Sequence, residues 1–147
     1  MGDTMTSAEL SKSYYPHLLP IETEVWREFL AKWGETWDRF EYDIHVGQGV
    51  QVGKKGDNKY ADNFATLTQK RIDAIGWNGK IPTLFEVREV GNLELIGKIE
   101  GYGILWERDY PMENTPELAI ICRRMGPDDL TVAAHKKISV YLTREEN

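Results

Sequence analysis

The stretch RIDAIGWNGKIPTLFEVR, residues 71–88, decides the fold class of this chain. Its two outer segments, 71–77 and 83–88, are rich in branched and aromatic residues, and the pair Asn78-Gly79 stands between them. An Asn-Gly pair is typical of the tight turns that join two antiparallel strands. The stretch therefore predicts a β-hairpin.

The predicted hairpin carries two carboxylates on strands that otherwise have the composition of buried strands. Asp73 is on the first strand and Glu86 on the second, with Arg88 two residues further on. Carboxylates are costly in apolar strands, so their presence needs a reason. With a two-residue turn at the Asn-Gly pair, Asp73 lies opposite Leu84, and Glu86 is its diagonal neighbour on the same face. The two carboxylates then converge on one point.

Converging carboxylates fit two interpretations. A divalent ion of the Mg²⁺ type is bound by one or two carboxylates together with waters and substrate phosphate, and it activates a water for attack on a phosphodiester. Alternatively, Asp73 and Glu86 pair with Arg71 or Arg88 in a buried ionic network whose role is structural. The hairpin by itself leaves both interpretations open.

Periodic segments on both sides of the hairpin predict the other elements. These are a helix from Pro20 to about Trp37, a strand over 40–46, an exposed loop over 51–63, a helix from the N-cap Asn92 to before Pro111, a strand over 118–122, a helix from 127 towards 136 and a strand over 138–142. The order αβββαβαβ predicts an α/β fold with a mixed sheet flanked by helices, because strands that are connected by helices run parallel.

The helix after Asn92 contains Gly97, Gly101 and Gly103. Each glycine costs roughly 1 kcal/mol in a helix interior relative to alanine. The three glycines therefore predict that this helix approaches the sheet closely.

Length and composition fit one globular domain. The chain has 147 residues, 41% of them hydrophobic, with scattered glycines and prolines. We expect one domain over 20–147, preceded by an extended arm over 1–19 whose aromatic pair Tyr14-Tyr15 docks on a neighbouring surface. The only cysteine, Cys122, lies in an apolar run and is expected to be buried.

Charge and hydropathy limit the classes of function. No apolar run approaches the roughly 20 residues that span a bilayer, and the N-terminus lacks a signal-peptide pattern. We therefore expect a soluble, cytoplasmic protein with no membrane contact. The net charge of −6 argues against a free-standing, non-specific nucleic-acid binder. It is compatible with a metal-dependent site, where the ion bridges acidic residues and substrate phosphate.

The pattern D-x12-E-x-R on a hairpin resembles the motif of the PD-(D/E)xK nuclease superfamily. The resemblance covers residues from about 22 to 143, and it combines a short motif with its placement among the expected elements. It implies a restriction-endonuclease-like three-layer core, with Mg²⁺ or Mn²⁺ as cofactor and DNA as substrate. Asp73 and Glu86 fill the two metal-binding positions, and Ile72 replaces the proline of the motif.

The resemblance also implies roles for cationic residues. Arg88 stands where the motif has a lysine, and it keeps the positive charge without the compact, titratable ammonium group. A charge-stabilising role therefore survives this substitution, whereas a proton-transfer role does not. Lys98 lies one turn before Tyr102, where some members have a Gln-x3-Tyr helix motif. It is the candidate to replace the missing ammonium, and the alternative is a solvated lysine on an amphipathic helix.

A third metal ligand is sometimes supplied by a helix in this superfamily. Glu22 is the candidate here, because it shares a side of the first predicted helix with Trp26, Phe29 and Trp33. The alternative is an N-terminal acid that complements the helix dipole.

Two functions remain open. The first is a metal-dependent nuclease-like protein that hydrolyses DNA phosphodiesters, favoured by the retained Asp73 and Glu86. The second is a catalytically inactive structural or interaction protein of the same fold, for example a virion component of a phage particle. In that case the N-terminal arm would mediate homo-oligomerisation or contacts with protein partners. The net negative charge, the arginine in the lysine position of the motif and the aromatic arm favour the second function.

Overall fold

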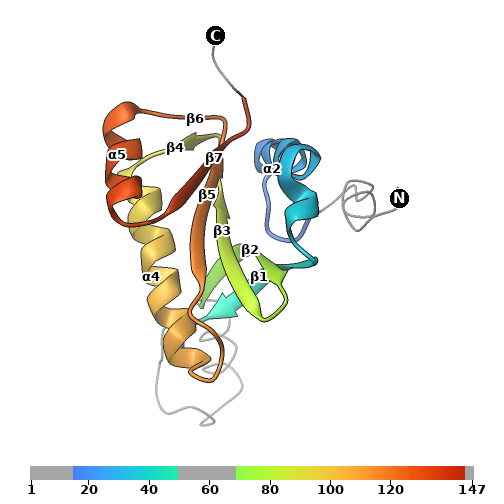
Figure 1. Ribbon diagram of the computed structural model, residues 1–147, viewed down its shortest axis with the longest axis vertical. Helices are drawn as coiled ribbons and strands as arrows, with labels where there is room; N and C mark the ends of the chain where they lie inside the picture. Colours follow the sequence, from blue (N-terminus) through green and yellow to red (C-terminus); the bar gives the residue numbers. More distant parts are fainter. Residues whose placement is uncertain (1–14, 50–68, 145–147) are drawn as a thin grey trace.

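A mixed five-stranded sheet forms the centre of the computed structural model, which describes residues 15–49 and 69–144 (Figure 1). In spatial order the strands are β1 (Arg39–Val46), β2 (Lys70–Asn78), β3 (Ile81–Val87), β5 (Glu117–Cys122) and β7 (Ser139–Leu142). The first three strands pair antiparallel, and β3, β5 and β7 pair parallel. The α/β class and the mixed sheet predicted from the sequence are thus confirmed.

Helices cover both faces of the sheet. Figure 1 shows α2 (Pro20–Trp33) on one side, and α4 (Leu93–Asp109) and α5 (Pro127–His135) on the other. Asn92 caps α4 as predicted, because its Oδ1 accepts a hydrogen bond of 2.9 Å from the Leu95 amide. In the described part of the chain, no helix is long and apolar enough to cross a membrane.

Some short elements were not predicted. The first helix ends at Trp33 and continues as a 3-10 turn, η1 (Gly34–Thr36). Two-residue strands β4 (Val90–Gly91) and β6 (Arg124–Met125) pair parallel beyond the main sheet. The predicted loop over 51–63 lies outside the described residues.

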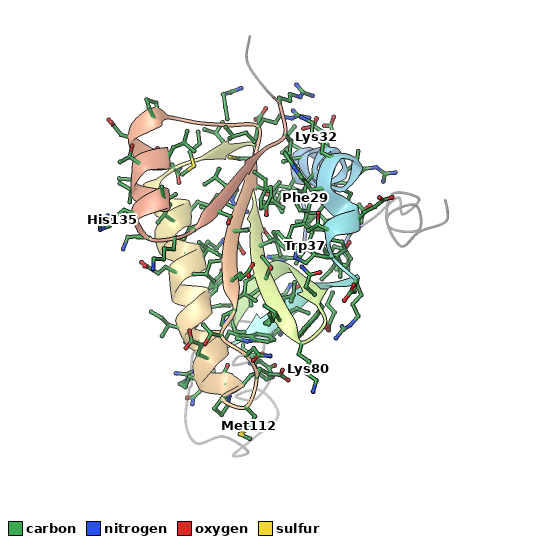
Figure 2. All side chains as sticks on the ribbon, viewed as in Figure 1. Phe29, Lys32, Trp37, Lys80, Met112 and His135 are labelled. Carbon is green, nitrogen blue, oxygen red and sulfur yellow. The ribbon has the colours of Figure 1, made fainter. Side chains whose placement is uncertain are left out.

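An aromatic core joins α2 to the sheet. Phe29 and Trp37 lie between the helix and the strands (Figure 2), where both contact the Phe85 ring. The described end of the predicted arm belongs to the same core, because Tyr15 is fully buried with its ring centroid 5.3 Å from that of Tyr42. Tyr15 therefore docks on its own domain, and residues 1–14 lie outside the described part.

The opposite face of the sheet has its own core beneath α4 and α5. Trp77 from β2 and Trp106 from α4 are both buried there, with ring centroids 6.2 Å apart. Cys122 is buried in this core as expected, and burial raises the pKa of its thiol to about 11.

The hairpin register differs from the predicted one by two residues. Asn78 pairs with Ile81, so the turn is Gly79-Lys80, and Ala74 lies opposite Phe85. The carboxylate of Asp38 stabilises this turn, since its Oδ2 accepts a hydrogen bond of 2.7 Å from the Gly79 amide. One residue beyond the Ala74–Phe85 pair, this register places Asp73 directly opposite Glu86. A shift of two preserves the face, because side chains alternate with a period of two.

The prediction for the glycines of α4 holds at one position only. A Cβ at Gly103 would lie 3.0 Å from Leu118 Cδ2, so the missing side chain allows the helix to approach β5. A Cβ at Gly97 or Gly101 would meet no heavy atom of the described residues within 4 Å. For these two glycines the predicted contact with the sheet is wrong, because both face outwards.

Candidate active site

Asp73 on β2 and Glu86 on β3 form a buried carboxylate pair. Their exposed fractions are 3% and 0%. Glu86 Oε1 accepts a hydrogen bond of 3.4 Å from the Asp73 amide, and Asp73 Oδ2 accepts one of 2.9 Å from the Val87 amide. These bonds tie the two side chains to the hairpin backbone, so their positions depend on the strand pairing rather than on flexible loops.

Arg88 follows β3 and turns back over the carboxylate pair. Its Nη1 lies 3.5 Å from Asp73 Oδ2 and 3.9 Å from Glu86 Oε2. The same nitrogen donates a 2.7 Å hydrogen bond to the Val87 carbonyl. Because both carboxylates approach one nitrogen, they lie on one side of the sheet and face a common point.

Lys98 reaches the same point from α4. Its Nζ lies 3.6 Å from Glu86 Oε2 and 5.8 Å from the centroid of the Tyr102 ring. Leu95, Ile99 and Tyr102 bury the neighbouring face of the helix against the sheet, which fixes where Lys98 projects. The structure thus brings Lys98 to the carboxylate pair, and its catalytic role stays a prediction.

Glu22 enters the cluster from the first turn of α2. Its Oε1 accepts a hydrogen bond of 3.0 Å from the Leu19 amide, as an acid at a helix N-terminus does. Its Oε2 lies 3.4 Å from Arg88 Nη1. Glu22 therefore satisfies the helix end and contacts the carboxylate pair through Arg88, and its role as a metal ligand stays a prediction.

Burial and like charge disturb the acidity of the pair. The pKa of Glu86 is raised to about 8, first by burial and then by the Asp73 charge, while Lys98 and Arg88 act in the opposite direction. Burial also raises the pKa of Asp73, against the hydrogen bond from Val87. Such strongly perturbed carboxyl groups cluster at functional sites.

The donor set suits a hard divalent cation with few protein ligands. Glu86 Oε2 is buried and accepts no hydrogen bond from the described residues, and its ionic contacts with Lys98 and Arg88 are as long as 3.6 and 3.9 Å. Mg²⁺ is commonly held by one or two carboxylates, with water and phosphate completing the shell. Within 15–49 and 69–144, no three His, Cys, Asp or Glu residues are gathered as a metal-binding group. The residues fit a two-carboxylate site.

A second ionic cluster near the site was missed from the sequence. The buried Arg123 makes a bidentate pair with Glu28 of α2, at 3.1 and 2.8 Å. Thr143 Oγ1 donates a 2.7 Å hydrogen bond to Glu28, and Arg144 adds contacts of 3.2 and 3.0 Å. The feature of the sequence that could have revealed this cluster is Arg123, an arginine directly after the apolar strand that ends at Cys122. The cluster fastens α2, and with it Glu22, to the ends of β5 and β7.

Comparisons of the chain with family models, with characterised proteins and with solved structures found no match.

Proposed function

We propose that the chain is a divalent-metal-dependent nuclease of the PD-(D/E)xK type that hydrolyses DNA phosphodiesters. The observation that carries this proposal is the buried pair Asp73 and Glu86, which two cations approach from different elements. In this proposal the mixed sheet and its helices correspond to the restriction-endonuclease-like core.

Asp73 and Glu86 would hold Mg²⁺ or Mn²⁺, because both present oxygen ligands on one face of the sheet. A bound ion of this kind lowers the pKa of its water and stabilises charge on a phosphoryl oxygen. The proposal also accounts for Glu86, since the added positive charge of a metal ion favours ionisation of a carboxyl whose pKa is otherwise about 8.

Lys98 would supply the ammonium group that the hairpin lacks. Its side chain is 37% exposed, so it borders solvent while its Nζ stays 3.6 Å from Glu86. A positive charge in this position stabilises the charge that develops on phosphate during hydrolysis. Arg88 contributes a second charge, and Glu22 holds its guanidinium in place through the 3.4 Å contact.

One observation favours the alternative of a catalytically inactive structural or interaction protein. Arg88 Nη1 lies within 3.4 to 3.9 Å of Glu22, Asp73 and Glu86, and it makes an ionic network without any metal. In that case the carboxylates serve the fold, and the partners are proteins or further copies of the chain.

Calorimetric titration of Mn²⁺ or Mg²⁺, followed by incubation with plasmid DNA, separates the two functions. We expect the wild type to bind metal and nick the plasmid, and Asp73→Asn to lose both. Asp128→Asn, on α5 and far along the chain from the pair, is the control and should retain both. A folded wild type that binds no metal and leaves the plasmid intact would support the inactive alternative.

A further inference from the structure

A groove of about 590 Å³ runs along α4 next to the candidate active site. It is lined by Lys70, Glu94, Gly97, Lys98, Gly101, Tyr102, Ile104 and Leu105. Lys98 also belongs to the carboxylate site, because its Nζ lies 3.6 Å from Glu86 Oε2 and 5.8 Å from the centroid of the Tyr102 ring. The groove and the site are therefore continuous.

The floor of the groove is bare helix backbone. Gly97 and Gly101 lie one turn apart on α4, and a side chain at either position would project into open space within the described structure. Glycine is the poorest helix former after proline, and Gly103 is explained by its contact with Leu118. The internal packing gives no such reason for Gly97 and Gly101, which leave α4 open to close approach from outside.

Each of the two lysines of the groove stands in a different part of the lining. The fully buried Glu86 has no hydrogen-bond partner for Oε2 in the described part of the chain, and this oxygen faces Lys98 at the groove's inner end. Lys70 adds a second cation from the side of Leu105, because its strand partner Val46 precedes Gly47, whose amide donates a 2.7 Å hydrogen bond to Asp109 near the end of α4. The lining also includes the acidic Glu94 and the apolar Ile104, which is 67% exposed.

This distribution suits a ligand with a phosphate near each lysine and a flat, largely apolar group between them. A rise of 1.5 Å per residue places Lys98 and Ile104 about 9 Å apart along the helix, roughly the length of one nucleotide. A base within a duplex is stacked and paired, so it is not free to lie against a helix backbone. An unpaired base presents its face to such a surface.

We infer that the α4 groove binds an unpaired nucleotide next to the scissile phosphate, so that the substrate is single-stranded or frayed DNA. This inference rests on the proposed nuclease function and adds the class of substrate. It also agrees with the net charge of −6, because two lysines in one groove replace the broad basic surface that duplex binders use.

Variants whose new side chains fill the groove test the inference, and the measured quantity is the affinity for DNA rather than the rate of cleavage. The probe is a fluorescein-labelled single strand of about 12 nucleotides, measured by anisotropy with Ca²⁺ in place of Mg²⁺. We expect the double variant Gly97→Leu/Gly101→Leu to bind it about tenfold more weakly than wild type while its Tm stays equal or rises, since leucine favours helix. Ala134→Leu adds the same kind of side chain to α5 outside the groove and should bind as wild type does.

Salt dependence gives an independent measurement. Two lysine contacts to a single strand predict a slope of log affinity against log salt of about −1.4, far shallower than the slope of a protein with many phosphate contacts. Lys70→Ala should bring the slope to about −0.7.

Defined results would overturn the inference. One is an affinity for the single strand that is the same in the double leucine variant and the wild type. Another is a wild type that binds a blunt duplex more tightly than the single strand. A third is a wild type that sediments as a dimer, while the double leucine variant sediments as a monomer. The proposed function fails separately, when wild type binds no metal and nicks no plasmid. If Asp73-dependent nicking persists while the leucines leave oligonucleotide binding unchanged, the function stands and the groove inference is wrong.

Discussion

Glu86 is a fully buried carboxyl group in a strand whose neighbours are apolar. Its pKa of about 8 shows that burial and the Asp73 charge outweigh the attraction of Lys98 and Arg88. The folded state without metal is therefore less stable with Glu86 ionised than with Glu86 protonated. Residues at functional sites often carry such a penalty, because the site is suited to its ligand rather than to the fold.

Replacing Glu86 by glutamine should stabilise the metal-free protein at alkaline pH. The folded pKa of about 8 lies above the ordinary 4.5, so ionisation destabilises the fold progressively as pH rises from about 4.5 to about 8. Glu86→Gln removes this loss, and we expect its Tm at pH 8.5 to exceed the wild-type value by about 3 °C, equivalent to roughly 1 kcal/mol. At pH 4.5 the difference should shrink. Equal Tm values at both pH values would contradict the expectation.

Lys98 should matter for cleavage more than its exposure suggests. Removing one group that stabilises transition-state charge typically lowers the rate by about 10²-fold or more, and we expect this loss in plasmid nicking by Lys98→Ala. Lys136→Ala is a matched control, because Lys136, which follows α5, pairs at 3.2 Å with Glu100 of α4 and lies outside the site. Unchanged nicking by Lys98→Ala with Mg²⁺ present would remove Lys98 from the mechanism.

At the scale of elements, α2 is fastened to the sheet by the Arg123–Glu28 cluster. Its contacts hold the pKa of Glu28 at about 2, first through the hydrogen bond from Arg123. A lowered carboxyl pKa stabilises the fold above the ordinary pKa of 4.5, and this contribution is lost as pH falls from about 4.5 to about 2. The position of Glu22 at the site thus depends on an ion pair several residues further along the helix.

Glu28→Gln should destabilise the protein by about 2 kcal/mol at pH 7, because the buried Arg123 loses its bidentate partner and keeps only the longer contacts with Glu89 and Glu24, at 3.6 and 3.8 Å. Denaturant unfolding at pH 7 and at pH 3 measures the effect, which should be smaller at pH 3, where the wild-type contribution is partly lost. Glu24→Gln is the control, since Glu24 is 64% exposed and 3.8 Å from Arg123. A similar loss in both variants would argue against the bidentate pair as the main contact.

Gly76 shows how three elements constrain one position of β2. A Cβ there would lie 2.9 Å from Trp37 Cδ1, and 3.0 Å from atoms of both Phe40 and Phe85. Gly76→Ala should therefore destabilise the fold by about 1–3 kcal/mol through overpacking. Gly101→Ala is the opposite case, with open space and a gain of up to about 1 kcal/mol in helix propensity. Opposite shifts of Tm in the two variants are the expected result.

At the scale of the whole molecule, metal binding and stability should be linked. A ligand that binds only the folded state at about 100 times its Kd stabilises that state by about 2.7 kcal/mol. We expect Mn²⁺ to raise the Tm of wild type and not that of Asp73→Asn, and a chelator to reverse the rise. An equal rise in both proteins would show that the ion binds elsewhere on this acidic chain.

The sequence alone determined the main helices and strands, because their signals are local, whereas it missed η1, β4 and β6. Period-two alternation, three-and-four spacing and the cap at Asn92 predicted the strands and helices, and the Asn-Gly pair predicted the hairpin. The predicted hairpin register also placed Asp73 and Glu86 on one face. This conclusion survived a register error, since a slip of two residues leaves the facing of side chains unchanged.

Only the tertiary structure decided which distant residues meet. Spacing along α4 did not show whether Lys98 points to solvent or to Glu86, because the rotation of a helix is set by the surface it packs against. For the same reason the glycines of α4 looked alike in the sequence, yet Gly103 contacts the sheet and Gly97 and Gly101 form a groove. Periodicity determines the faces of an element, and packing between elements determines what each face contacts.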